Sequence, residues 1–491
     1  MNKTKLFNII SIIILILILF VGFSYQFAFS KNEFPNEIIS KFQSFLYEYT
    51  SFDDELPVLF ADDNNKSQSK PSYITKNDAL EDIDYLFSLL KYGYSGYEYF
   101  GGDEKFNSAK DNMIWSITEF NGKTICPNKL LDIIYSELKF IQDSHFTIGS
   151  YRMCQFTKYF SSRKYTFNRN ADGFYTSIDN EVFYLNTVNN GDPVDYLKLS
   201  LDDDGNIIYN LGILHDAEDI SISVDISLVS KDNAKNEKVS LFEYIPIYRE
   251  KYNSYNYYEI DDIPILEVNC LCRVTPEDNT MEEFISHSNK LRDKEAIIID
   301  LRNNDGGNLI NVEEWYKGFT GEKLRKDIVK TGLYTNTSLT LAKHKFEIKK
   351  NETERVRNEC IETILDYEKE DYFPGWSSIE YEDFEPVENN VKIYILVDKN
   401  TSSASEFLTY YLKKLDNVVV VGTNTNGCVL TGNSNSAYLP HSNIPLNISH
   451  IIYMTKDFDD IEGIGILPDL WIKPDQALDR LVKYINNNKQ K

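Results

Sequence analysis

A buried strand that ends in a polar, glycine-rich turn is encoded by IIIDLRNNDGG, residues 297–307. The apolar run before Asp300 lacks polar alternation, as expected for a strand that is covered on both faces in a parallel sheet. The two closing glycines, Gly306 and Gly307, let backbone N–H groups approach a ligand or an oxyanion closely. This segment therefore predicts both a core strand and the edge of a site.

Strand and helix patterns alternate on both sides of this segment. Alternating units of this kind predict a mixed α/β fold with a largely parallel core sheet, placed at 255–480. We expect an insertion over the core at about 308–388, because this charged and aromatic stretch has no evident place in the sheet. The expected strands cover 265–268, 296–301, 391–397, 418–421 and 448–454, and the expected helices cover 281–292 and 406–415.

Two further regions are predicted ahead of the core. Residues 75–145 form a helical region, with a first helix capped from Thr75 and others at 104–120 and 127–140. Residues 165–250 form a small β-rich module that contains a turn at 189–193 and a short helix at 194–199. The strands expected in this module cover 173–178, 181–185, 220–228 and 238–244.

The net charge and the cysteine count limit the partners and cofactors of this chain. The chain has 491 residues and a net charge of -25, so nucleic acid is excluded as a partner because its phosphates would be repelled. The six cysteines match neither a zinc site nor a disulfide-dense scaffold, and their pairing cannot be deduced. We therefore predict no metal and no other cofactor. The oligomeric state is left open.

The N-terminus has the pattern of an export signal. Lys3 and Lys5 precede an uncharged apolar run at 6–29, whose length is close to the ~20 residues that cross a bilayer. Ala28-Phe29-Ser30 offers a small-x-small cleavage site. Residues 1–30 are therefore predicted as a cleaved signal peptide or an uncleaved anchor, and 31–74 as a linker region. Either alternative places the bulk of the chain outside the cytoplasm, secreted or anchored to the cell membrane.

A candidate nucleophile lies in TSSASE, residues 401–406, between a buried strand and a helix. A serine at such a turn presents its hydroxyl where free N–H groups of the helix can stabilise an oxyanion. The bland alternative is a helix N-cap, for which serine is common. Ser403 is the preferred nucleophile, with Ser402 and Ser405 as lesser candidates.

Three other segments carry polar groups that belong to the same chemistry. They are QDSHFT at 142–147, which is expected at the end of the third helix, VVVGTNTNGC at 419–428, and EGIGILPD at 462–469. Each is ordinary alone, and a lone histidine is more often structural. Their joint content is what makes a hydrolytic site the better interpretation.

In this order, DLRNNDGG, TSSASE, the G-x-x-T-x-G stretch and GIGILPD resemble the tail-specific, or C-terminal-processing, family of serine peptidases, family S41. The resemblance covers about residues 75 to 480 and is strongest from about 295 to 475. It implies the family's crotonase- and Clp-protease-like spiral core of ββα units. It also implies an inserted PDZ module, whose place is taken here by residues 165–250.

The resemblance also separates two branches of the family. The processing branch uses a serine and a lysine that follows T-x-G, but Cys428 follows that motif here. The tricorn-like branch uses serine, histidine and glutamate, with a second serine beside the histidine. Ser144, His145 and Glu462 stand in the matching places, so the chain resembles this branch more closely.

This resemblance implies a role for each candidate residue. His145 would take the proton of Ser403 and pass it to the leaving amine, so activity should rise with pH. Glu462 and Ser144 would fix the tautomer of the histidine. The oxyanion hole would combine the N–H of Ala404 with that of Gly306 or Gly307.

The expected function is an extracytoplasmic serine endopeptidase that hydrolyses unfolded or flexible protein segments through an acyl-enzyme. Its partners would be polypeptide substrates, and the membrane if residues 1–30 stay attached. Two alternatives remain. The chain could be an inactive relative that binds a ligand or peptide, or an esterase that uses the same serine.

Overall fold

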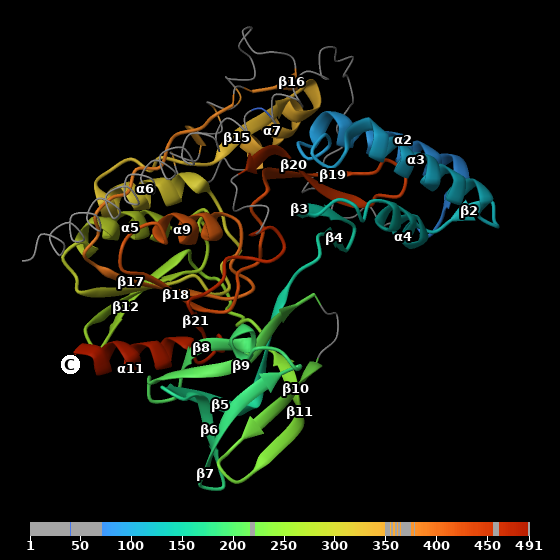
Figure 1. Cartoon of the computed structure of the whole chain (residues 1–491). Coiled ribbons are helices and arrows are strands. Elements are labelled where there is room, and N and C mark those ends of the chain that lie inside the picture. Colours follow the sequence, from blue (N-terminus) through green and yellow to red (C-terminus); the bar gives the residue numbers. More distant parts are fainter. Residues whose placement is uncertain are drawn as a thin grey trace, which may run out of the picture.

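The computed structural model describes residue 40 and residues 71–489, apart from 217–220, most of 349–374, residue 378 and 455–460. The predicted export segment at 1–30 lies outside the described residues, as does nearly all of the predicted linker at 31–74. Within the described part of the chain, no helix combines the length and apolarity needed to cross a membrane. The fold is mixed α/β with several sheets (Figure 1), as predicted.

The core is a six-stranded sheet whose strand order is β12-β13-β14-β17-β18-β21. All pairings from β13 to β21 are parallel, and only β12 joins in the antiparallel direction. The expected parallel sheet is therefore present, with boundaries that differ by a few residues. The strand expected at 448–454 does not belong to it, because these residues are part of β20, which pairs in the antiparallel direction in a second sheet. The strands are Tyr255–Ile260, Ile263–Val268, Ala296–Asp300, Lys392–Val397, Val418–Gly422 and Leu470–Trp471.

Helices cover both faces of this sheet (Figure 1). Ile297 and Ile299 of β14 pack with α5, α6 and α9 on one face, whereas Ile298 packs with α11 on the other. Successive side chains of a strand point to opposite faces, so an uninterrupted apolar run is what this position requires. The helices are α5 Thr280–His287, α6 Leu309–Thr320, α9 Ala404–Leu412 and α11 Ala477–Lys489.

A second sheet, antiparallel throughout, has the order β16-β15-β20-β3-β4, with β19 paired to β20. The DSH segment was expected at a helix end but lies in β3, because Thr147 and Ile148 pair with β20. Helix α4 ends earlier than expected, at Glu137. The strands are β3 Asp143–Ile148, β4 Tyr151–Met153, β15 Val329–Tyr334, β16 Gly375–Trp376, β19 Thr431–Tyr438 and β20 Pro445–Met454.

The helical region packs against this second sheet. Its helices bury a shared cluster of apolar side chains with Phe146, Ile148, Leu446 and Ile448. The helices are α2 Lys76–Gly93, α3 Gly102–Glu119 and α4 Pro127–Glu137, and the short strands β1 Ile74–Thr75 and β2 Thr124–Ile125 pair beside them. Thr75 caps α2, as the sequence predicts.

The expectation that 308–388 lies over the core without a place in a sheet is wrong for the part that is described. Helix α6 buries Val312, Trp315 and Phe319 in the main core, and β15 pairs with β20. Helix α7, Asn336–Ile348, follows β15. Trp315 and Phe319 are core residues of helix α6, and Trp376 lies in strand β16. Most of 349–374 lies outside the described residues.

The β-rich module is a seven-stranded antiparallel sheet in which β11 also pairs with β5. The helix expected at 194–199 is instead the 3₁₀ turn Pro193–Tyr196 followed by β8, because Leu197 begins a strand paired with β9. The strands are β5 Lys158–Asn170, β6 Gly173–Ile178, β7 Glu181–Val188, β8 Leu197–Leu201, β9 Ile207–His215, β10 Ser221–Val229 and β11 Ala234–Glu243.

Candidate active site

Ser403 lies where the parallel sheet meets helix α9. Strand β17 ends at Val397, and α9 begins at Ala404. Ser403 has φ 55° and ψ −122°. Such a left-handed backbone costs a non-glycine residue about 1–3 kcal/mol. The N–H of Ser402 donates to Asn304 O at 2.9 Å, which ties this turn to the loop after β14. A strained strand-to-helix turn presents its serine hydroxyl outward.

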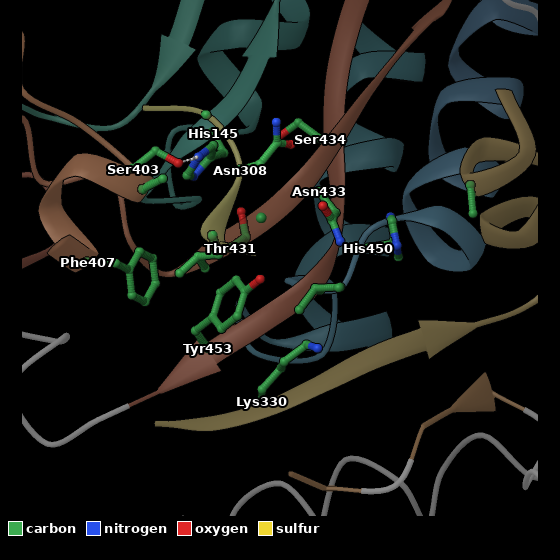
Figure 2. A pocket seen from close by; sticks show the side chains of 16 residues that line it. His145, Asn308, Lys330, Ser403, Phe407, Thr431, Asn433, Ser434, His450 and Tyr453 are labelled. Carbon is green, nitrogen blue, oxygen red and sulfur yellow. Dashed lines mark hydrogen bonds between the residues drawn. The ribbon is translucent and has the colours of Figure 1, made fainter. Parts of the chain in front are cut away.

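His145 comes from the second sheet and meets Ser403. Its Nε2 lies 3.1 Å from Ser403 Oγ, and Figure 2 shows the two side chains facing each other. The backbone N–H of His145 donates to Asp143 Oδ1 at 2.9 Å. Asp143 also accepts from Tyr94 OH at 2.7 Å and from Thr431 Oγ1. The structure thus brings the predicted nucleophile and base together.

Glu462 and Ser144 form a second cluster behind the histidine. Ser144 donates its N–H to Glu462 Oε1 at 2.8 Å, and its hydroxyl binds the same oxygen. The other carboxylate oxygen accepts from the N–H groups of Val429 and Leu430 at 2.8 and 2.9 Å. Ser144 Oγ also lies 2.8 Å from Gly427 O. Glu462 therefore connects the histidine strand to the loop at 427–430.

The second ring nitrogen of His145 faces a thiol. Cys428 Sγ lies 3.2 Å from His145 Nδ1. We expected Glu462, directly or through Ser144, to support this nitrogen. Cys428 is a contact at Nδ1 that we did not predict, and support by Glu462 and Ser144 stays a prediction.

Glu406 joins the serine turn to the loop that carries Cys428. Its Oε2 accepts from the N–H groups of Ser403 at 2.9 Å and Cys428 at 2.8 Å. Its Oε1 accepts from Thr425 Oγ1 at 2.5 Å and Gly427 N at 2.7 Å. The side chain is fully buried, and burial raises its pKa. One carboxylate therefore sets the spacing between the nucleophile and the group behind the histidine.

Lys399 binds two loops of the site together. Its Nζ donates to the backbone oxygens of Thr425 and Asn426 at 2.9 and 3.0 Å. It also donates to the backbone oxygens of Gly463 and Ile464, each at 3.3 Å. Burial lowers the pKa of Lys399 to about 8. These contacts assign the lysine a structural role beside the Ser403–His145 pair.

Of the two glycines predicted to supply an oxyanion donor, Gly307 is the better placed. The N–H of Gly306 is engaged, because it donates to Asn304 Oδ1 at 3.0 Å. A Cβ on Gly306 would lie 2.8 Å from Ser403 Cβ, so this glycine permits the close approach of the two loops. Gly307 and Ala404 both line the pocket beside Ser403. Their N–H groups are the stronger pair for an oxyanion hole.

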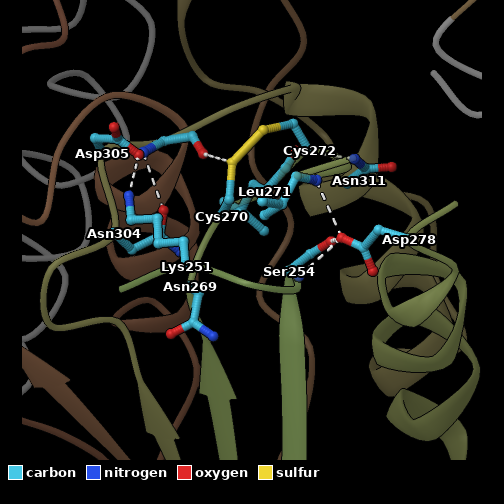
Figure 3. Close-up of a disulfide and its surroundings, with 12 residues drawn as sticks. Lys251, Ser254, Asn269, Cys270, Leu271, Cys272, Asp278, Asn304, Asp305 and Asn311 are labelled. Carbon is cyan, nitrogen blue, oxygen red and sulfur yellow. Dashed lines mark hydrogen bonds and ion pairs between the residues drawn. A yellow bond between two sulfur atoms is a disulfide. The ribbon is translucent and has the colours of Figure 1, made fainter. Parts of the chain in front are cut away.

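A disulfide supports this loop from behind (Figure 3). Cys270 and Cys272 are bonded to each other, and Leu271 between them donates its N–H to Gly306 O at 2.8 Å. A Cβ on Gly307 would lie 2.3 Å from Leu271 C, so only glycine fits against this backbone. The sequence left the cysteine pairing open. The structure places one pair directly behind the predicted oxyanion loop.

A pocket of about 260 Å³ opens beside Ser403 and His145. Phe407 and Tyr453 form an aromatic pair in its wall, with ring centroids 5.4 Å apart. Lys330 lies toward the other end (Figure 2). Within the described residues, no group of three or more His, Cys, Asp or Glu side chains is arranged to hold a metal.

The carboxyl groups and the thiol behind His145 have raised pKa values. Burial, followed by repulsion from Asp143, raises the pKa of Glu462 to about 7. Burial also raises the pKa of Asp143. The Cys428 thiol has a pKa well above its ordinary value, through burial and then the charges of Glu462 and Glu406. At neutral pH the thiol therefore keeps its proton.

Sequence reasoning missed three groups of this site: Cys428, Glu406 and Lys399. Signals existed for two of them. Glu406 stands three residues after Ser403, the spacing at which an acidic side chain reaches back to a helix start. Cys428 directly follows T-x-G, where the resemblance places a catalytic lysine in the other branch. Nothing in the sequence around Lys399 distinguishes it from a surface lysine.

Comparison with known proteins shows that part of the chain is similar to a peptidase family. Residues 265–472 match the model of Peptidase family S41, which supports this family for the stretch that contains Ser403 and Glu462. No curated protein sequence matches. Among solved structures, mature CPAF is 15% identical, with a TM-score of 0.43 over 84% of this chain and 95% of that one.

Two further solved structures are similar at the same low level. The photosystem II D1 C-terminal processing protease is 12% identical, with a TM-score of 0.35 over 82% of this chain and 94% of that one. The tricorn protease is 12% identical, with a TM-score of 0.38 over 85% of this chain and 37% of that one.

Proposed function

We propose that this chain is a serine peptidase of the S41 type that cleaves peptide bonds through an acyl-enzyme intermediate. The observation that carries the proposal is the 3.1 Å contact between Ser403 Oγ and His145 Nε2, made at a strained turn ahead of a helix. The match of residues 265–472 to Peptidase family S41 supports it independently.

The geometry permits each step of acyl transfer. As Ser403 Oγ attacks the carbonyl carbon, His145 Nε2 takes the hydroxyl proton. The N–H groups of Gly307 and Ala404 stabilise the negative oxygen of the tetrahedral intermediate. His145 then gives its proton to the leaving amine, and the acyl-enzyme remains. Water attacks the ester with His145 again as base, and the acid product leaves with Ser403 restored.

Within the family we assign the chain to the branch that uses serine, histidine and glutamate. Support comes from His145 at the nucleophile and from the bonds of Ser144 to Glu462. Cys428 stands where the other branch keeps its lysine. Lys399 contacts four backbone oxygens, so its amine is already occupied by structural contacts.

The proposal extends to the rest of the chain. We propose that the core is the spiral of ββα units and that the module at 165–250 holds the PDZ position. The described residues of that module include no α-helix that could form a second wall of a PDZ groove, so C-terminal recognition is not included. An extracytoplasmic location rests on the sequence of 1–30. A preference for unfolded segments rests on the size of the pocket beside Ser403, about 260 Å³, which suits side chains of an extended chain.

The test is cleavage of a denatured protein mixture by the full chain, analysed by mass spectrometry. Wild type and Ser402→Ala should yield the same products, and Ser403→Ala should yield none. Ser402→Ala is a matched control because it removes the neighbouring hydroxyl. A folded wild type that yields no peptides would favour the binding-protein alternative. Hydrolysis of esters without peptide products would favour the esterase.

A further inference from the structure

We propose that Cys428 is the positioning residue of His145, the group that holds the imidazole in the tautomer able to accept the Ser403 proton. This inference rests on the proposed function and deepens it. Cys428 Sγ lies 3.2 Å from His145 Nδ1, while Ser403 Oγ lies 3.1 Å from Nε2. The ring is thus held between a thiol and a hydroxyl, in the place where a carboxylate orients the base of other serine hydrolases.

The backbone that carries Cys428 is fixed by two buried carboxylates. Glu406 accepts the N–H groups of Gly427 and Cys428 at 2.7 and 2.8 Å. Glu462 accepts the N–H groups of the next two residues, 429 and 430, at 2.8 and 2.9 Å. Charge-assisted hydrogen bonds of this kind are stronger than neutral ones. The sulfur therefore has a defined position relative to the ring, which a positioning residue requires.

The position of the imidazole hydrogen decides whether His145 Nδ1 donates to Cys428 Sγ or accepts from it. A neutral imidazole carries one N–H, and Nε2 can take the Ser403 proton only when that hydrogen is on Nδ1. The Nδ1–H then donates to Cys428 Sγ, so the thiol hydrogen must point away from the ring. The Ser144 hydroxyl, which binds Glu462, lies near the Cys428 side chain, and its effect is to lower the pKa of the thiol.

The contacts join Ser403, His145 and Cys428 in one chain, and the bonded pair of Ser144 and Glu462 lies beside it. A thiol that keeps its proton at neutral pH can turn its hydrogen away from the ring while its sulfur accepts from Nδ1. If the thiol instead donated to Nδ1, the ring hydrogen would move to Nε2 and the base would be blocked. The positioning role therefore requires that the thiol hydrogen does not occupy Nδ1.

Cys428 acts through His145 and not on the substrate. Ser403 and His145 line the pocket, and Cys428 is absent from its lining residues. The cysteine is also buried, with 6% of its surface exposed. Its sulfur therefore lies on the opposite side of the imidazole from the nucleophile. This position excludes it as a second nucleophile for a peptide held in the pocket.

The test combines ring spectroscopy with kinetics on the full chain. Selective ¹⁵N labelling is practical because the chain has only six histidines, and His145→Gln identifies the signal of interest. In wild type, the ¹⁵N shifts should show hydrogen on Nδ1. Cys428→Ala should give a mixed tautomer and lower kcat about tenfold, the worth of one neutral hydrogen bond, with KM unchanged. Cys428→Ser, which keeps an acceptor, should restore both readouts, and Cys126→Ala should change neither.

The two readouts separate this inference from the proposed function. A tautomer and kcat unchanged in Cys428→Ala would overturn the positioning role, even if wild type cleaves peptides. The opposite result is also distinguishable. If the folded wild type hydrolyses nothing, but Cys428→Ala still shifts the His145 hydrogen away from Nδ1, the positioning role holds and the peptidase proposal is contradicted. The positioning role would also be overturned if folded Cys428→Ser showed the same mixed His145 tautomer as Cys428→Ala.

Discussion

The two sides of the site are built on different principles. The serine side comprises Ser403, Ala404 and the loop at 301–307, all at the ends of neighbouring parallel strands. The histidine side comprises residues 143–145, 425–430 and Glu462. Its contacts join residues far apart in the chain, with a separation of 283 between His145 and Cys428. The serine side is formed by the ends of adjacent strands in one sheet, and the histidine side requires contacts between segments that are not neighbours in that sheet.

Two carboxylates, Asp300 on the serine side and Glu462 on the histidine side, have pKa values shifted in opposite directions. On the serine side, burial tends to raise the pKa of Asp300, but Arg302 and Arg249 outweigh it and the pKa is lowered. On the histidine side, Glu462 is bound by N–H and O–H groups, and its pKa rises to about 7. An ion-paired acid keeps its charge at neutral pH, whereas a buried acid without a cation titrates there. Glu462 should therefore titrate near neutral pH, whereas Asp300 should not.

The largest expected effect tests whether the two sides act as one unit. Ser403→Ala and His145→Ala should each lower kcat/KM by about 10⁴-fold or more, and the double variant should be no worse. This follows because the serine is unreactive without its base. Steady-state kinetics on one peptide substrate would measure it. Ser402→Ala is the matched control. Lys399→Met tests the alternative base, and a larger loss in this folded variant than in His145→Ala would contradict the assignment of His145.

The next largest effect concerns the link between the sides. Glu406 accepts four hydrogen bonds, two on each oxygen, whereas glutamine would turn an NH₂ group toward two of these donors. Glu406→Gln should lower the free energy of unfolding by about 1–3 kcal/mol and reduce kcat. Urea unfolding and kinetics measure the two effects. The exposed Glu104→Gln should change neither, and equal stability of both variants would contradict the role of Glu406.

The sequence predicts the elements of the serine side better than the contacts of the histidine side. The strand at Ile297, the turn at Ser403 and the glycines after β14 follow from local patterns, because apolar runs and turn residues specify them directly. His145 was chosen as a site residue, yet it was expected at the end of a helix. It lies in β3 because residues 147 and 148 pair with β20. Pairing over about 300 residues leaves no mark in a local window.

The groups that support the histidine show the same limit. Cys428 was noted only as a missing lysine, and Cys270–Cys272 only as a gap unsuited to zinc. Side-chain partners depend on which loops the fold brings together, and each of these cysteines has an ordinary sequence neighbourhood. Glu462 was chosen as a support of the His145 ring, and its hydrogen bonds to Ser144 could not be read from spacing. Local pattern therefore predicted the candidates, and tertiary assembly determined their contacts.

A smaller effect probes the support of the serine side. In the double variant Cys270→Ser/Cys272→Ser, the backbone of Leu271 should hold Gly306 and Gly307 less firmly. We expect kcat to fall about tenfold with KM unchanged, less than the 10²–10³-fold typical for loss of a whole oxyanion donor. Dithiothreitol should reproduce the loss in wild type and leave the double variant unaffected. Cys126→Ser is the control, and an unchanged kcat in the double variant would show that the loop needs no disulfide.

The smallest effect separates the charge behaviour of the two sides. Between the ordinary 4.5 and about 7, folded Glu462 binds more protons than the unfolded chain does, so its contribution to stability falls as pH rises. Glu462→Gln lacks this term, so from about pH 5 to about pH 8 wild type should lose stability relative to the variant. Chemical unfolding across this range measures the difference. Activity should run the opposite way in wild type, because the carboxylate form is the better acceptor for Ser144. Parallel stability curves for the two proteins would show that Glu462 stays charged throughout and that the pH dependence of activity arises from the base alone.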